Sequence, residues 1–338
     1  MEPFLLGSGT SETSEFSLEL MIDGVRFEYV LALDGEAVHY EALFHYPERK
    51  RRRVFEREGL NLTLQRGLGG LSGTRELLTG RTLVLSVARR FDEPLITGFA
   101  RELVQIEGHG RDVLSSLRAV IERSFVVGES VDLWRTNRVD TAGGSELVDR
   151  ARALAMLRLA DLGIQDVRVI DEEVKLFGKL ASNVPTLQLL HRTAEGSVAF
   201  DLEKESQGTQ TWLSLIGPVL TALRQGTLMV FDELEASLHP TLSAELLRIF
   251  ADPTLNPRGA QLVFTSHDTS LLNHLNRDEV WLTEKRPDGS TRLGALSDFA
   301  GERVRKSQNL ESAYLHGRFG ALPQLDQTEL LRALGLIG

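Results

Sequence analysis

Two short apolar runs that each end in polar residues constrain the fold of this chain most strongly. Residues 228–231 (Leu-Met-Val-Phe) lead directly into Asp232 and Glu233, and residues 261–264 (Gln-Leu-Val-Phe) lead into 265–268 (Thr-Ser-His-Asp). The interval between them has room for one helix and a loop. An alternation of helix and buried strand, which begins at about residue 206, is typical of a parallel α/β sheet.

The polar residues after these runs are candidates for chemistry, because ligands of doubly wound sheets bind at the carboxyl ends of the strands. Asp232 can hold Mg²⁺, and Glu233 can orient or deprotonate an attacking water. His267 can reach a phosphate held by the neighbouring strand. Taken alone, the acidic pair could be a charged turn and the histidine could be structural. Their occurrence in this order favours the functional interpretation.

A third candidate is the stretch Ser206, Gln207, Gly208 and Thr209, which precedes the amphipathic segment 212–223. A small, hydroxyl-rich stretch that opens a helix offers free backbone N–H groups and the positive end of the helix dipole to an anion. An ordinary N-cap made by Ser206 or Thr209 is also possible, and the two roles are compatible.

Together, these motifs resemble the C-terminal half of an ABC-type ATPase core across residues 206–283. The resemblance is to AAA-like ATPases related to the SMC and DNA-repair ATPases, many of which serve in abortive-infection or anti-phage systems. In that family a Ser-x-Gly-Thr signature, an apolar strand that ends in Asp-Glu, and a Thr-x-His-Asp switch strand occur in this order. The expected fold class is therefore α/β, an ABC-type P-loop NTPase-like core that is incomplete, with an antiparallel β lobe and a helical insert.

The resemblance also implies roles for the site residues. It assigns Mg²⁺ binding to Asp232 (the Walker B aspartate), polarisation of the hydrolytic water to Glu233, and sensing of the γ-phosphate of ATP to His267. It further implies that Ser206, Gln207, Gly208 and Thr209 close over ATP bound to a second subunit, in a head-to-tail dimer. The stretch 235–240 is similar to the D-loop of the family.

Local patterns divide the chain into four expected parts. Hairpins with turns at Asp23-Gly24 and Asp34-Gly35 predict an antiparallel sheet near the N-terminus. Helical spacing follows between residues 75 and 125, with a strong helix candidate at 145–162 and short strands after it. The expected parts are 1–70, the antiparallel β part of the first lobe; 71–165, a helical insert; 166–290, the ATPase core; and 291–338, a C-terminal tail.

The composition excludes several classes of protein. The 338 residues include no cysteine, so disulfides, zinc–thiolate sites and cysteine nucleophiles are excluded. No apolar run approaches the roughly 20 residues that span a bilayer, and residues 1–13 do not resemble a signal peptide. We therefore expect a cytoplasmic protein without a membrane partner. The net charge of −10 argues against nucleic-acid binding by the whole surface. The basic stretch 49–53 is interpreted first as a solvated hairpin turn, and alternatively as a phosphate-backbone contact.

A phosphate-binding P-loop, Gly-x-x-x-x-Gly-Lys-[Ser/Thr], is missing from the sequence. In the family that loop precedes the strands of the first lobe. Three explanations are open: a truncated gene or start site, a P-loop on a separate polypeptide, or a degenerate subunit that does not hydrolyse ATP. The presence of Asp232, Glu233 and His267 favours truncation or a split gene.

The expected function is that of an ATP-binding and ATP-hydrolysing subunit that uses ATP and Mg²⁺. The resemblance implies that this subunit serves in a phage-defence or DNA-transaction system. The expected partners are ATP, a second copy of the chain or a P-loop-bearing chain, and a nuclease or DNA. The alternative is a non-catalytic regulatory or scaffold subunit that docks on a true ATPase or nuclease. The isolated chain is expected to be weakly active or inactive, and poorly soluble or only partly ordered around residues 200 to 285 because its central sheet would lack a flank.

Overall fold

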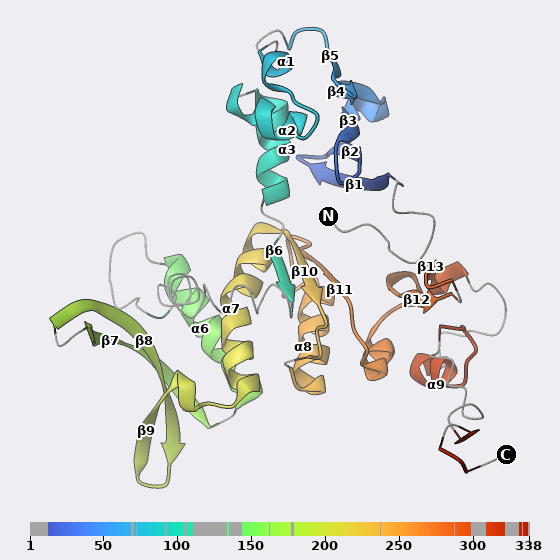
Figure 1. The fold of residues 1–338 in the computed structure, drawn as a ribbon. Coiled ribbons are helices and arrows are strands. Elements are labelled where there is room, and N and C mark those ends of the chain that lie inside the picture. Colours follow the sequence, from blue (N-terminus) through green and yellow to red (C-terminus); the bar gives the residue numbers. More distant parts are fainter. Residues whose placement is uncertain are drawn as a thin grey trace. The chain divides into compact units, whose positions relative to one another are not determined.

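A computed structural model describes residues 13–68, 71, 73–91, 93–104, 107–110, 134, 144–161, 163–176, 179–236, 238–286, 288–298, 309–321, 331–332 and 334–336. The chain forms two compact units, each described here by itself (Figure 1). The first comprises residues 1–105 and 283–293, and the second comprises residues 106–282 and 294–338. No helix among the described residues is long and apolar enough to cross a membrane.

An antiparallel meander forms the first unit, as its hairpin signals predict. The strands pair in chain order and are β1 (Ser14–Ile22), β2 (Val25–Leu33), β3 (Val38–His45), β4 (Arg52–Glu58) and β5 (Asn61–Leu64). The predicted turn between β1 and β2 is present, and both of its residues have positive φ, 49° at Asp23 and 76° at Gly24. Such angles match a type I′ turn, which follows the twist of the paired strands.

Three helices cover one face of this meander and complete its core. They are α1 (Thr74–Leu77), α2 (Val84–Ala88) and α3 (Pro94–Val104), with the 3₁₀ turn η4 (Arg89–Phe91) between the last two. Phe99 of α3 lies against the rings of Phe27 and Tyr29. The helical spacing predicted after residue 75 is thus present as three short helices up to residue 104. The prediction is wrong at 107–110, where the chain forms a strand that pairs with a distant segment, and its part at 111–125 lies outside the described residues.

The basic stretch 49–53 lies at the connection between β3 and β4, next to the 3₁₀ turn η2 (Pro47–Arg49). Two of its arginines are paired with acids of the same sheet: Arg51 donates to Glu28 at 3.0 Å and 3.1 Å, and Arg53 donates to Glu56 at 2.8 Å. The Arg51 guanidinium pairing with Glu28 holds the pKa of that carboxyl below its usual range. This geometry agrees with the hairpin-turn interpretation of the stretch.

A small parallel sheet is at the centre of the second unit. Its order is β11 (Gln261–Phe264), β10 (Leu228–Asp232), β6 (Glu107–Gly110), and β10 runs parallel to both neighbours. The helices α7 (Gln207–Gln225) and α8 (Pro240–Ala251) precede and follow β10, and α6 (Gly144–Ala160) packs against α7. Met229 and Phe231 of β10 enter a continuous apolar core with Trp212 and Leu246 of these helices. The expected α/β alternation after residue 206 is confirmed, but the expected burial of the second strand is not, because no residue of β11 is buried.

Two further groups of elements lie outside the parallel sheet. The first lies wholly in the second unit, and the second includes residues 283–293 of the first unit. The strands β7 (Ile164–Leu176), β8 (Lys179–Thr193) and β9 (Gly196–Asp201) form an antiparallel sheet, longer than the short strands the sequence predicts. A hairpin of β12 (Trp281–Lys285) and β13 (Thr291–Ala295) and the short helix α9 (Leu310–Leu315) follow the core. The 3₁₀ turns of this part are η5 (Leu202–Lys204), η6 (Thr269–His274), η7 (Arg277–Glu279) and η8 (Leu296–Asp298).

Candidate functional site

The hydroxyl of Thr265 joins the ends of the two central strands. Phe231 and Phe264 are paired in the sheet, so Asp232 and Thr265 are the next residues along each strand. Thr265 Oγ1 donates to Asp232 Oδ1 at 2.6 Å and accepts from the backbone N–H of Glu233 at 2.8 Å. Asp232 is exposed, and no described residue hydrogen-bonds its second oxygen, Oδ2. One carboxylate oxygen is thus fixed while the other faces solvent.

Glu233 has a left-handed backbone, with φ of 52°. This conformation is uncommon for residues other than glycine and costs free energy, on the order of 1 kcal/mol or more. It is held by the bond from its own N–H to Thr265 and by the next residue, Leu234, whose N–H donates to the Thr265 carbonyl at 3.0 Å. The turn therefore fixes the direction in which the Glu233 side chain leaves the sheet edge.

Glu235 connects the same turn to His267. Its Oε1 accepts the backbone N–H of His267 at 2.7 Å, and the His267 side chain is exposed. Two carboxylate oxygens close to this contact, Glu235 Oε2 and Asp268 Oδ2, are buried without a hydrogen-bond partner. Buried polar atoms of this kind are unusual and are often satisfied by a water, an ion or a ligand. The candidate residues Asp232, Glu233 and His267 thus share one hydrogen-bonded edge, as expected from their places after parallel strands.

The stretch from Ser206 to Thr209 opens helix α7. Ser206 is the N-cap: its Oγ accepts the Thr209 N–H at 3.1 Å and lies 2.9 Å from the Thr209 hydroxyl. Ser206 and Gln207 are exposed, Gly208 is half-buried, and Thr209 is buried. The capping interpretation is therefore realised.

Helix α7 and strand β10 run in opposite directions, because only Gly226 and Thr227 lie between them. The start of α7 and the end of β10 consequently lie at the same end of this unit (Figure 1). Glu205, just before the N-cap, is held by His191 of β8, whose Nε2 lies 2.7 Å from Glu205 Oε1. This contact ties the β7–β9 sheet to the entry of the helix.

Sequence reasoning names Asp232, Glu233 and His267 as the chemistry-bearing residues and misses the roles of Thr265 and Glu235. Neither role has a signal in local patterns, because both depend on the register between β10 and β11. In the sequence, Thr265 is only the first residue of the Thr-Ser-His-Asp stretch. Its position directly after an apolar strand that neighbours Asp232 is the one feature that could have identified it.

The edge of β11 that faces away from β10 has no partner strand among the described residues. The N–H groups of Gln261 and Thr265 donate to Thr227 and Phe231, so alternate residues of β11 face β10. The backbone groups of Leu262 and Phe264 therefore point to the other edge. On the sheet face opposite to their side chains, Val263 is 56% exposed. An open edge and an exposed apolar side chain occur together here.

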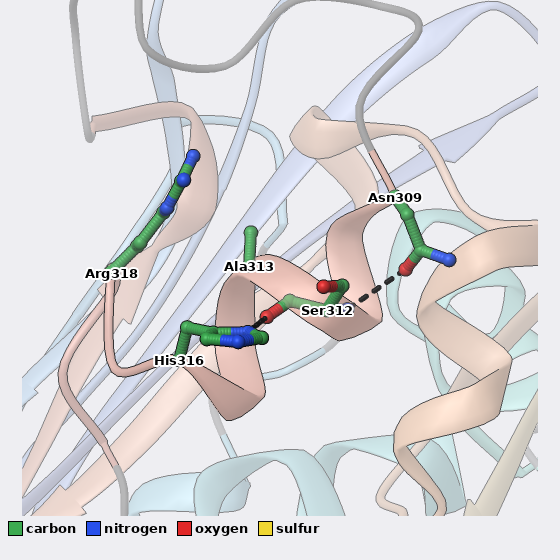
Figure 2. A pocket seen from close by; sticks show the side chains of 5 residues that line it. All are labelled: Asn309, Ser312, Ala313, His316 and Arg318. Atoms are coloured by element: carbon green, nitrogen blue, oxygen red, sulfur yellow. Dashed lines mark hydrogen bonds between the residues drawn. The ribbon is translucent and has the colours of Figure 1, made fainter.

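A small recess lies beside α9, in the C-terminal part of the second unit, with a volume of about 160 Å³. Figure 2 shows that two of its polar side chains, Asn309 and His316, form hydrogen bonds with the backbone of Ser312 in α9. Asn309 Oδ1 accepts the N–H of Ser312 at 2.8 Å, and His316 Nδ1 donates to the Ser312 carbonyl at 2.6 Å. The recess is therefore explained by local capping.

The fold and this sheet edge define an ATPase-like α/β domain with an additional antiparallel lobe. The family model described as "AAA domain, putative AbiEii toxin, Type IV TA system" matches residues 75–273, more than half of the chain. The chain belongs to this family of AAA domains. A search of curated proteins found no match. Among solved structures, the chain is similar to an SMC head bound to the C-winged helix domain of ScpA, with 13% identity, 84% of this chain and 74% of that chain covered, and a TM-score of 0.40.

Proposed function

We propose that this chain is an ATP-hydrolysing subunit in which the edge formed by Asp232, Glu233 and His267 carries the chemistry, within an assembly that supplies a P-loop. The observation that carries the proposal is the hydroxyl of Thr265, which fixes Asp232 through a side-chain bond and Glu233 through a backbone bond. Phosphoryl transfer depends mostly on positioning and electrostatic stabilisation, so two carboxylates held at one strand end fit its needs.

The donor set at this edge fits Mg²⁺. Within the described residues no group of three or more acidic or histidine side chains is gathered as a metal cage. Mg²⁺ does not need one, because it usually takes one or two carboxylates together with waters and substrate phosphates. Asp232, with Oδ1 fixed by Thr265 and Oδ2 facing solvent, would hold the ion. A bound Mg²⁺ would neutralise charge on the β- and γ-phosphates.

Glu233 and His267 would act on the two sides of the reaction. The left-handed backbone at Glu233 aims its carboxylate away from the strand, where it would orient the attacking water and accept its proton. His267 is exposed, and its backbone is fixed by Glu235, so its ring would contact the γ-phosphate. Ser206, Gln207, Gly208 and Thr209 would contact ATP bound to a second subunit in a head-to-tail dimer, at the positive end of the α7 dipole.

The open edge of β11 supports the need for a further segment. A parallel strand there would pair with the outward-facing backbone groups of Leu262 and Phe264. It would end at the same carboxyl edge as Asp232, so a phosphate-binding loop after that strand would lie beside the candidate residues. We propose that this strand and its P-loop come from additional sequence of the same protein or from a partner chain.

The test compares phosphate release with Mg·ATP for the isolated chain and for the complex that it forms in its native cell. We expect turnover by the complex, little or none by the chain alone, and loss of turnover in Glu233→Gln. Glu195→Gln is the matched control, because Glu195 is an exposed glutamate in the turn between β8 and β9 and is not one of the residues proposed to contact ATP. Robust turnover by the chain alone that Glu233→Gln abolishes would contradict the need for a supplied P-loop. A complex unaffected by Glu233→Gln and Asp232→Ala would favour the scaffold alternative.

A further inference from the structure

A second recess of the second unit lies where helices α6, α7 and α8 meet the loop that follows α8, and its volume is about 500 Å³. Its floor and walls are apolar, formed by Met156, Leu159, Leu220, Leu223, Ile249 and Leu255. Two of these side chains remain substantially open to solvent, Leu159 at 47% and Leu255 at 44%. A recess of this size is within the range of small-molecule sites, which are mostly apolar with a few polar groups.

The polar residues around this recess are mostly cationic. Four arginines line it, Arg152, Arg224, Arg248 and Arg258, against the single carboxylate of Glu245. Glu245 is engaged by Arg248, with bonds of 2.5 Å and 2.8 Å. Arg248 also lies 3.8 Å from Asp252, so four arginines face two carboxylates here, and an excess of positive charge remains in a chain whose formal net charge is −10. It therefore marks a local preference for anions.

Helix dipoles account for only part of this charge. Arg224 and Arg248 are in the last turns of α7 and α8, where cations are favoured in any helix. Arg152 is in the middle of α6, and Arg258 is in the loop before β11. Arg258 packs beside the C-terminus of α7, but Arg152 has no helix C-terminus that explains its place. Four guanidiniums from four separate segments converge on one apolar recess.

The recess is separate from the proposed ATP site. Arg258 packs beside the C-terminus of α7, where its carbonyl would lie 2.8 Å from a Cβ placed on Gly226. Gly226 precedes β10, so the recess is at the start of that strand, whereas Asp232 is at its end. Helix α7 carries the signature stretch at one end and Arg224 at the other, and its 19 residues span roughly 28 Å.

We propose that this recess binds a small amphiphilic organic anion, with its apolar body on the leucine and methionine side chains and its carboxylate, sulfonate or phosphate head among the arginines. The recess is bordered by three helices and by residues 254–258 of the loop after α8, an arrangement that suits a compact ligand better than an extended peptide. The proposal does not depend on ATP hydrolysis.

The test uses the full chain and two fluorescent probes of nearly equal apolar size: 8-anilinonaphthalene-1-sulfonate, which is an anion, and N-phenyl-1-naphthylamine, which is neutral. We expect one site for the anionic probe and weaker binding of the neutral one. Arg152→Glu and Arg258→Glu should each weaken binding of the anion roughly fivefold. Arg192→Glu, an exposed arginine of β8, makes the same charge change outside the recess and should leave binding unchanged.

A second readout locates the probe. The chain has four methionines, and Met156 lines the recess, whereas Met21 is 68% exposed in the first unit. With ¹³C-methyl methionine, the anionic probe should shift the Met156 resonance, assigned from Met156→Leu, and leave Met21 unchanged. The proposal is overturned if the Met156 signal does not move, if the neutral probe binds as tightly, or if the two glutamate variants bind like the unmodified chain. Melting curves of both variants exclude loss of fold as the cause of weaker binding.

Discussion

At the scale of single residues, Thr265 organises more of the candidate site than either carboxylate does. Its hydroxyl is the only side-chain group among the described residues that contacts both the Asp232 side chain and the Glu233 backbone. Threonine can fill this role because a hydroxyl donates one hydrogen bond and accepts others at the same time. The position of Asp232 and the unusual backbone of Glu233 are therefore coupled through one atom.

Removal of this hydroxyl should impair turnover more than stability. In Thr265→Val both bonds are lost at an exposed site, so we expect a cost of about 1 kcal/mol in the free energy of unfolding. Turnover by the complete assembly should fall on the order of 10- to 100-fold, because a displaced carboxylate loses its alignment. Thr265→Ser retains the hydroxyl and is the control. Equal turnover in the valine and serine variants, measured by phosphate release, would argue against the positioning role.

Replacement by alanine should change the free energy of unfolding in opposite directions at two glycines, one that caps a helix and one that lies inside a helix. Gly226 caps α7 with φ of 76°, and an added Cβ would lie 2.8 Å from the Arg258 carbonyl. Gly226→Ala should therefore cost about 2 kcal/mol or more in the free energy of unfolding. Gly98 is inside α3 with open space around it, so Gly98→Ala should stabilise by about 0.5–1 kcal/mol. Urea unfolding of both variants checks the pair, and a stabilised Gly226→Ala would contradict the capping geometry.

At the scale of elements, α7 combines two roles that the sequence leaves open. Its N-terminal stretch is capped by Ser206, and its buried face, which includes Trp212 and Leu213, enters the main core. Trp212 Nε1 donates to the Met156 carbonyl of α6 at 2.7 Å, which joins the two helices. The helix is thus held from within the protein, while Ser206 and Gln207 remain exposed at its start.

Capping and the proposed contact with ATP can be separated at Ser206. Aspartate is as good an N-cap as serine, so Ser206→Asp should keep the melting temperature. Its negative charge would face the phosphates of the opposite subunit, so turnover and ATP-dependent dimerisation should fall strongly. Ser206→Asn, a neutral residue that also caps, is the control. A Ser206→Asp variant with normal turnover would show that the residue has only a capping role, and one that unfolds like Ser206→Ala would contradict the expected capping by aspartate.

The elements themselves were mostly predictable. The turn at Asp23-Gly24, helix α8 and strands β10 and β11 follow from local residue patterns. Strand β6 was missed, because its sequence Glu-Gly-His-Gly has none of the branched or aromatic residues typical of strands. It forms beside β10 in a parallel pair, so its conformation is decided by a partner far away in sequence.

At the scale of the whole molecule, the two units are stabilised by separate apolar cores. One core joins the meander to α2 and α3, and the other joins α6–α8 to the parallel sheet. The first unit also buries a charged pair, Glu41 and Arg57, whose polar atoms are 3.9 Å apart. Glu41 accepts the N–H groups of Val84 and Leu85 and the hydroxyl of Tyr29, so the buried carboxylate is satisfied by the start of α2.

The open edge of the parallel sheet should govern the behaviour of the isolated chain. An exposed apolar residue on a strand with one unpaired edge, as β11 is among the described residues, favours association between chains, and a lysine at that position opposes it. Val263→Lys should therefore raise the concentration at which light scattering of the isolated chain begins. Trp281→Lys is the matched control, because Trp281 is also exposed, at 60%, but lies in the β12–β13 hairpin. If the two variants improve solubility equally, general surface hydrophobicity and not the β11 edge is the cause.

The sequence by itself determined the α/β core, the order of its motifs and the residue types at the strand ends. These features follow from local periodicity and from the polar residues that interrupt it. Only the tertiary structure decided that Thr265 bridges Asp232 and Glu233, that Glu235 holds His267, and that four arginines surround one apolar recess. The physical reason is that such contacts depend on strand register and helix packing, which join residues far apart in the chain and leave no mark in any local pattern.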